Sequence, residues 1–87
     1  MKNNALKINE KDNVAIAIRE IAKGETIILN EKPVFVANES IASGHKIATE
    51  PIKPGEMVFR YGEAIVKATR VISRGEWVHI HNTEPIS

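Results

Sequence analysis

Residues 21–27 read IAKGETI, and the same pattern of Ile, two variable residues, Gly, two variable residues and a final Ile or Val occurs four times in the 87-residue chain. The other copies are IASGHKI at 41–47, IKPGEMV at 52–58 and ISRGEWV at 72–78. The offset from the first copy to the third equals the offset from the second to the fourth. This spacing predicts a domain made of two similar halves, with an internal pseudo-two-fold repeat.

Each copy is interpreted as a tight turn that joins two strands. The first Ile ends a strand in the core, the Gly permits the positive φ of a turn, and the final Ile or Val begins the next strand. The segments NVAIAI at 13–18, KPVFVAN at 32–38 and MVFRYG at 57–62 are rich in β-branched and aromatic residues. Composition would also allow helices at 13–23 and 64–72, but the short spacing of the turns argues against them. We expect a mostly β fold, although hairpin turns without a shared origin would give the same pattern.

The length of the chain limits what it can enclose. A domain of this size buries only about 60% of the surface that its unfolded chain exposes, so a complete catalytic pocket would need a second domain or subunit. We expect a single domain over residues 1–87, in which the polar residues 1–11 form a loosely ordered N-terminal lead.

Composition excludes several classes of function. The formal net charge is +1 with acids and bases interspersed, so we expect no nucleic acid partner. The absence of cysteine excludes disulfides and thiolate metal sites. No apolar run approaches the roughly 18 residues of a membrane span, and the polar start lacks a signal peptide, so we expect no membrane partner and a cytoplasmic location.

Two of the three histidines lie in VHIHN at 78–82. If this segment is a strand, His79 and His81 share one face, roughly 6.5–7 Å apart, while Val78 and Ile80 share the other. Such a pair can share a divalent metal, or one imidazole can bind an anion while the other exchanges a proton. Asn82 adds an amide. The alternative is a pair of histidines that decorates a solvent-exposed strand.

The third histidine interrupts a feature of the repeat. Three copies carry an acid after the glycine, Glu25, Glu56 and Glu76, whereas the second copy has His45. A shared turn glutamate is expected to pair with a basic neighbour or a backbone amide, so the change to His45 indicates a reassigned turn, or else a neutral surface substitution. Lys46 adds a fixed positive charge for a carboxylate. The hypothesis is a common rim formed by His45, Lys46, His79 and His81, with Trp77 as a wall or an interface anchor.

Three longer stretches resemble a known family. They are DNVAIAIREIAKGETI at 12–27, SGHKIATEPIKPGEMVFRYGEAIVKAT at 43–69 and ISRGEWVHIHN at 72–82. Together they resemble the SAF domain of the UxaA family, which implies a β-clip fold. Val66 stands where family members commonly have Gly, and the sequence ends with HNTEPIS, where single-chain members continue into a larger catalytic region.

The resemblance implies part of a hydro-lyase similar to altronate dehydratase, a small subunit or N-terminal-type domain that is not active alone. Its expected partners are a large catalytic subunit and a sugar acid, with a homo-oligomer left open, and its expected cofactor is a divalent metal, iron or manganese. By analogy His45, His79 and His81 are catalytic, Lys46 and Asn82 bind substrate, and His79 and His81 are metal ligands. The small subunit of (2R)-sulfolactate sulfo-lyase and a non-catalytic carbohydrate-binding or assembly module are the alternatives.

Overall fold

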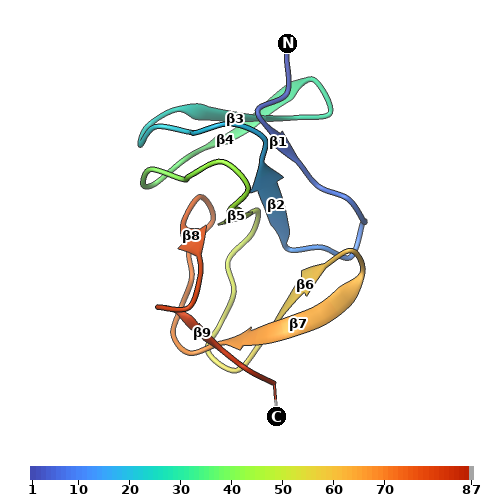
Figure 1. Ribbon diagram of the computed structural model, residues 1–87, viewed down its shortest axis with the longest axis vertical. Helices are drawn as coiled ribbons and strands as arrows, with labels where there is room; N and C mark the ends of the chain where they lie inside the picture. The colour runs from blue at the N-terminus through green and yellow to red at the C-terminus, as the bar shows by residue number, and fades with distance from the viewer. Residues whose placement is uncertain (87) are drawn as a thin grey trace.

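The computed structural model describes residues 1–86 and is built from short β-strands (Figure 1). The strands are β1 (Ala5–Leu6), β2 (Val14–Ala17), β3 (Thr26–Leu29), β4 (Lys32–Val36), β5 (Lys46–Ala48), β6 (Met57–Arg60), β7 (Glu63–Ala68), β8 (Trp77–Val78) and β9 (Thr83–Glu84). The described residues include no helix that could cross a membrane. The predicted mostly β, SAF-like class is therefore confirmed, and the helical alternatives are excluded.

The strands form three antiparallel sheets. A central sheet has the order β1-β2-β5-β8, β3 and β4 form a hairpin, and β6, β7 and β9 form a three-stranded sheet. The β3-β4 hairpin and the β6-β7-β9 sheet lie toward opposite ends of the molecule, with β2, β5 and β8 between them (Figure 1). Strand β8 is an edge strand of the central sheet, so the residues that follow it lie at the rim.

The two hairpins confirm the internal repeat in three dimensions. The first turns at Asn30 and Glu31, with φ of 50° and 65°, and the second turns at Tyr61 and Gly62, with φ of 57° and 78°. Positive φ at both central positions is typical of a type I′ turn, whose twist matches that of the flanking strands. Each hairpin also shifts register after the second residue of its first strand. The two hairpins are therefore equivalent down to their irregularities.

The first isoleucines of the four turns pair with one another across the chain. Ile21 and Ile41 form one isolated antiparallel bridge, and Ile52 and Ile72 form the other, with reciprocal N–H···O bonds of 2.8 Å. These four side chains and the apolar residues that end the four motifs are at most 1% exposed. They divide between two clusters, one for each half, so the predicted core positions are confirmed.

The turn glutamates have the structural role expected of them. In Glu25, Glu56 and Glu76 one carboxylate oxygen accepts the backbone N–H of the residue three positions earlier, at 2.7–3.0 Å. Glu25 also pairs with Arg19, and Glu76 pairs with Arg70 at 3.0 Å. The carboxylate thus closes the turn around its glycine.

A buried asparagine fastens the strand that follows each of these three turns. The side chains are Asn4, Asn13 and Asn82, at 1%, 8% and 0% exposure. Each Oδ1 accepts the backbone N–H of the residue three positions after the turn glutamate, and each Nδ2 donates to the carbonyl of the residue one position after it, at 2.8–2.9 Å. We call this arrangement the asparagine clamp. It replaces a strand partner by a side chain, because one amide offers both a donor and an acceptor.

The N-terminal segment packs against the rest of the domain, where Asn4 forms the first clamp. We expected residues 1–11 to form a loosely ordered lead, whereas Asn4 and Ala5 are buried and β1 pairs with β2. The segment is polar in composition, but the amide of its Asn4 is hydrogen-bonded to the backbone of Thr26 and Ile28 in β3.

Gly75 differs from Gly24 in what surrounds it, which predicts different costs for the same substitution. Both have positive φ, 92° and 87°, but a Cβ at Gly75 would lie 2.5 Å from the Val36 carbonyl oxygen, while Gly24 has nothing within 4 Å. Gly24→Ala should lower the free energy of unfolding by about 1–2 kcal/mol, the cost of the left-handed conformation. Gly75→Ala should lose about 1–3 kcal/mol more, because backbone must move. Urea denaturation measures both, and equal losses would contradict the packing described for Gly75.

The Arg19–Glu25 pair predicts a pH dependence of stability. The Arg19 guanidinium, and then the Ala22 N–H, lower the pKa of Glu25 to about 2. A carboxylate with a depressed pKa stabilises the fold above its unfolded pKa of roughly 4.3, and this contribution is lost as the pH falls toward 2. Glu25→Gln should therefore destabilise the chain clearly at pH 7 and progressively less between pH 4 and pH 2. The control is Glu50→Gln at an exposed position, and a Glu25→Gln deficit that is constant over this range would refute the expectation.

Candidate anion-binding site

The chain after β8 turns instead of continuing as a strand. Strand β8 ends at Val78, and residues 79–82 form a turn in which Asn82 N–H donates to the His79 carbonyl at 3.2 Å. The predicted strand over 78–82 is therefore wrong, and Ile80 does not share the buried face of Val78 but is 82% exposed. The Asn82 clamp causes the turn, because its side chain occupies the backbone groups of Trp77 and His79 that a longer strand would pair.

The structure nevertheless brings the three histidines together, with Trp77 at their centre. The His79 ring stacks on the indole, with centroids 4.8 Å apart and planes 12° apart. The His81 and His45 rings lie 4.8 Å and 5.6 Å from the indole. The His45 and His79 rings are 5.1 Å apart, although the two residues belong to different halves of the sequence. The turn thus delivers the same imidazoles that a strand was expected to deliver.

His45 occupies the one turn of the four that lacks a glutamate. Its ring does not close the turn in the manner of Glu25 but faces the edge strand, where His45 Nδ1 accepts the indole Nε1–H of Trp77 at 3.1 Å. Pairing of β5 with β8, in which Ile47 lies opposite Trp77, sets the two residues at this separation.

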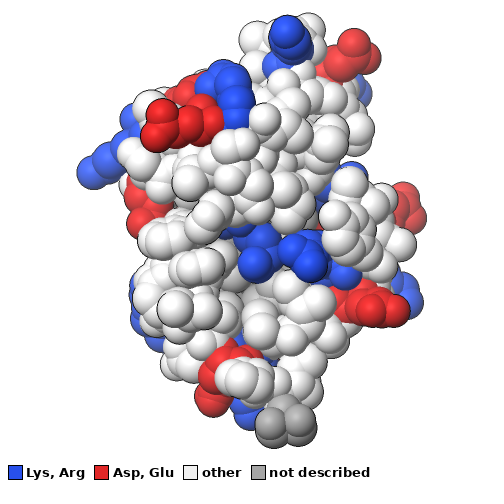
Figure 2. Space-filling view, viewed as in Figure 1, with Lys and Arg blue, Asp and Glu red and all other residues white. Residues whose placement is uncertain are grey.

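Lys46 begins β5, and a second cation affects it. Burial lowers the pKa of Lys46, and the positive charge of Arg60 lowers it further. Arg60 ends β6, its guanidinium lies 5.1 Å from the Tyr61 ring centroid, and its Nε is buried without a hydrogen-bond partner. Figure 2 shows lysine and arginine atoms in the middle of one face, with uncharged surface above and below them. We call His45, Lys46, Arg60, His79 and His81 the basic cluster.

No residue of the basic cluster forms an ion pair with an acid within residues 1–86. Burial lowers the pKa of His79, and the charges of His45, Lys46 and His81 lower it further. Among residues 1–86 the ion pairs are Arg19–Glu25 and Arg70–Glu76, neither of which includes a cluster residue. The carboxylate of Glu39, which lies beside Trp77, accepts the Trp77 backbone N–H at 2.9 Å. The cations Lys46 and Arg60, which lie near each other and form no ion pair in the described part of the chain, favour the binding of an anion.

Arg60 was not predicted from the sequence, although a signal for it exists. It occupies the position in the second half that Leu29 occupies in the first, so a cation stands where the first half has a partly buried apolar residue. We interpreted MVFRYG only as an alternating strand. Comparison of the two halves position by position would have singled out Arg60 in the way that it singled out His45.

Asn82 lies beside the cluster but its amide is not available to a ligand. The residue is 0% exposed, and its Oδ1 and Nδ2 bond the backbone of His79 and Trp77. Asn82 holds the backbone of His79 and Trp77 and thereby positions their two rings.

The three imidazoles do not by themselves form a metal centre. Within residues 1–86 no three His, Asp or Glu side chains are arranged to hold a metal ion. His45 Nδ1 already accepts the indole N–H, so the cluster offers fewer imidazole donors than the four or more ligands that a divalent metal takes.

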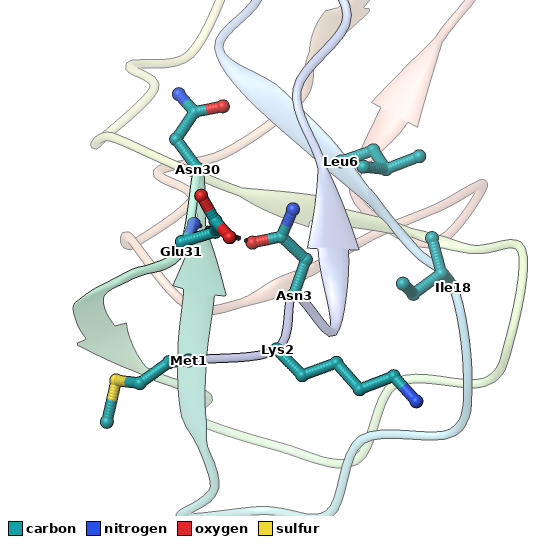
Figure 3. A pocket seen from close by; sticks show the side chains of 7 residues that line it. All are labelled: Met1, Lys2, Asn3, Leu6, Ile18, Asn30 and Glu31. Carbon is teal, nitrogen blue, oxygen red and sulfur yellow. Dashed lines mark hydrogen bonds between the residues drawn. The ribbon is translucent and has the colours of Figure 1, made fainter.

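A hollow of about 500 Å³ lies elsewhere, around the N-terminal segment (Figure 3). Its lining residues are Met1, Lys2, Asn3, Leu6, Ile18, Asn30 and Glu31. Asn3 Oδ1 accepts the Glu31 backbone N–H at 2.7 Å, which joins the first residues to the β3-β4 turn. The hollow is lined by no histidine and is open to solvent between the terminus and a hairpin turn, and Asn3 Oδ1 is engaged by the Glu31 N–H. We therefore place the candidate site at the basic cluster.

Two matched β halves with a basic rim at the edge of the central sheet define a small SAF-like domain. The chain belongs to the family described as the altronate/galactarate dehydratase SAF domain, whose model matches residues 3–85. It is 40% identical over 79 residues to an altronate dehydratase of Bacillus subtilis (strain 168), covering 91% of this chain and 16% of that protein.

Two proteins of Escherichia coli (strain K12) are also similar. An altronate dehydratase is 37% identical over 78 residues, covering 90% of this chain and 16% of that protein. A galactarate dehydratase (L-threo-forming) is 35% identical over 74 residues, covering 84% of this chain and 14% of that protein. The chain thus spans about one sixth of the length of these relatives.

Removal of the Asn82 amide should destabilise the fold. Asn82→Ala leaves the half-buried His79 N–H and Trp77 carbonyl without the Asn82 amide, so we expect a loss of about 2 kcal/mol in the free energy of unfolding. Asn4→Ala removes the equivalent clamp of the first half and should cost a similar amount, whereas Asn3→Ala, at an exposed hydrogen bond, should change it by less than about 0.5 kcal/mol. Urea denaturation tests the three variants, and wild-type stability of Asn82→Ala would show that this amide is free to serve a ligand.

Proposed function

We propose that this chain is the SAF part of a sugar-acid hydro-lyase, as a small subunit or an N-terminal-type domain, and that the basic cluster binds the carboxylate of the substrate. The observation that carries the proposal is that two cations, Lys46 and Arg60, lie near each other in partly buried positions and neither forms an ion pair with an acid among the residues that the structure describes. The printed names of the relatives, altronate and galactarate dehydratase, support a polyhydroxy acid as the ligand.

The cations suit the recognition of a carboxylate. Arg60 offers a planar fork of donors that matches a carboxylate, and Lys46 offers a compact charge. Removal of water from a sugar acid takes a proton from the carbon next to the carboxylate, and the electrons of that C–H bond form the double bond as the neighbouring hydroxyl departs. Cations that hold the carboxylate also stabilise the negative charge that develops on it.

His79 and His81 are assigned the proton that the departing hydroxyl needs. The pKa of His79 is lowered while the cluster is unliganded, which favours the neutral ring. A bound carboxylate adds a negative charge beside it and raises that pKa, which favours the protonated ring when the substrate is bound. The imidazolium can then donate the proton to the hydroxyl, which leaves as water. The base that removes the first proton belongs to the catalytic region, and His45 is assigned to the binding of a ligand oxygen.

The proposal assigns Asn82 to the support of His79 and no longer to direct contact with substrate. Iron or manganese would stabilise the developing negative charge in such a reaction, but two imidazoles do not complete a metal site. We therefore assign the metal to ligands of the catalytic region, which leaves His79 and His81 for the transfer of the proton. The same proposal places the assembly in the cytoplasm.

The test exchanges the matching segment of the Bacillus subtilis altronate dehydratase for this chain and measures the loss of water from altronate. The hybrid should be active, and Lys46→Gln and Arg60→Gln should each lower kcat/KM by about 10- to 100-fold, because a charge-assisted hydrogen bond is lost. Lys53→Gln, in an exposed turn of the same chain, is the matched control and should retain activity. Full activity of the Lys46→Gln and Arg60→Gln hybrids would overturn the carboxylate assignment.

A binding measurement on the isolated chain separates the alternatives. Altronate or galactarate should raise the pKa of His79, followed by NMR of the imidazole protons, whereas the uncharged polyol altritol should not. A preference for sulfolactate would instead favour a sulfo-lyase. Tight binding of sugar acids by the chain with no activity in the hybrid would favour a carbohydrate-binding module.

A further inference from the structure

We propose that Trp77 is a positioning residue that holds His45 as the neutral imidazole with its proton on Nε2. An indole N–H donates and cannot accept, so the Nδ1 atom of His45 that receives it at 3.1 Å carries a lone pair. A neutral imidazole has one N–H, which then lies on Nε2. Trp77 thus determines which atom of His45 is offered to the rest of the cluster.

The indole is held in place from several sides, so its N–H is a prearranged donor. The Trp77 backbone N–H donates to Glu39 Oε2 at 2.9 Å, and the Trp77 carbonyl accepts Asn82 Nδ2 at 2.8 Å. The His79 ring stacks on the indole face. The register of β8 with β5, in which Trp77 lies opposite Ile47, fixes the position of Trp77 along the edge of the central sheet. Each of these contacts is independent of the His45 ring.

This assignment divides the roles among the three histidines. Coordination of a metal, or acceptance of a proton, through Nε2 of His45 would require a lone pair there and a proton on Nδ1, where it would meet the Trp77 N–H. His45 is therefore a hydrogen-bond donor toward an oxygen of the ligand. Proton exchange is left to His79 and His81. We call the Trp77–His45 hydrogen bond, which fixes the His45 tautomer, the lock. The lock is a property of this chain, whereas its use toward a carboxylate or hydroxyl oxygen rests on the proposed function.

The lock is tested by NMR of the wild-type chain labelled with ¹⁵N, at a pH of about 8.5, where histidine is ordinarily neutral. We expect a scalar coupling across the hydrogen bond between Trp77 Nε1 and His45 Nδ1, and a single Nε2–H tautomer of His45 in long-range ¹H–¹⁵N spectra. Trp77→Phe keeps an aromatic ring for His79 but removes the donor, so it should abolish the coupling and allow a measurable fraction of the Nδ1–H tautomer. Absence of the coupling in the wild type, or a His45 Nδ1–H tautomer, would overturn the inference without need of any variant.

The role of the free donor is tested separately with altronate. His45→Gln places an amide N–H near the position of Nε2 and should retain affinity within about threefold, whereas His45→Ala should lose about tenfold. Equal losses in both variants would contradict the donor role. If the coupling is present and neither variant changes the affinity, the lock stands and the ligand contact fails, so the two conclusions are distinguished.

Discussion

The fold depends on the need to bury the apolar residue on each side of four tight turns, since residues 1–86 contain no helix that could supply a core. Ile21 pairs with Ile41 and Ile52 with Ile72, which brings the two turns of each half together at their bases. A domain of this size has little core to spare, so these pairs and the apolar residues that follow the glycines make up most of it. Because short strands offer few ladder bonds, the backbone that leaves three of the turns needs another partner, and buried asparagines provide it.

The candidate site arises where the repeat is broken. Three turns are closed by a glutamate and followed by an asparagine clamp, but the second turn carries His45, and its following strand β5 is paired on both sides within the central sheet. With main-chain partners on both edges, β5 needs no clamp. The position that holds a glutamate in the other turns is occupied here by His45, whose ring faces Trp77. Arg60 is a second departure, since it replaces the apolar residue of the first half. Symmetry supplies the scaffold, and the departures from it supply the charges.

The sequence was informative about what is local and repetitive. Glycine spacing predicted the turns, the alternation of apolar residues predicted the strands, and the loss of the turn acid singled out His45. The strand expected over 78–82 was wrong because Asn82 bonds the backbone of Trp77 and His79, a short-range contact that no alternation pattern encodes. Long-range contacts were also out of reach, because the burial of Asn4 depends on a hairpin that is distant in the sequence.

The charges of the basic cluster are costly to the isolated fold, which bears on why they are there. Partial burial of Lys46 next to Arg60 raises the free energy of the charged forms, and the lowered pKa of Lys46 expresses this cost. Arg19 and Arg70 pair with turn glutamates, so the chain has the means to neutralise a cation and does not use them here. A bound anion would remove the repulsion and satisfy the buried Nε of Arg60. Stability sacrificed at one place on an otherwise well-bonded scaffold is typical of a binding site, and this is the physical argument for seeking the ligand at the rim beside β8.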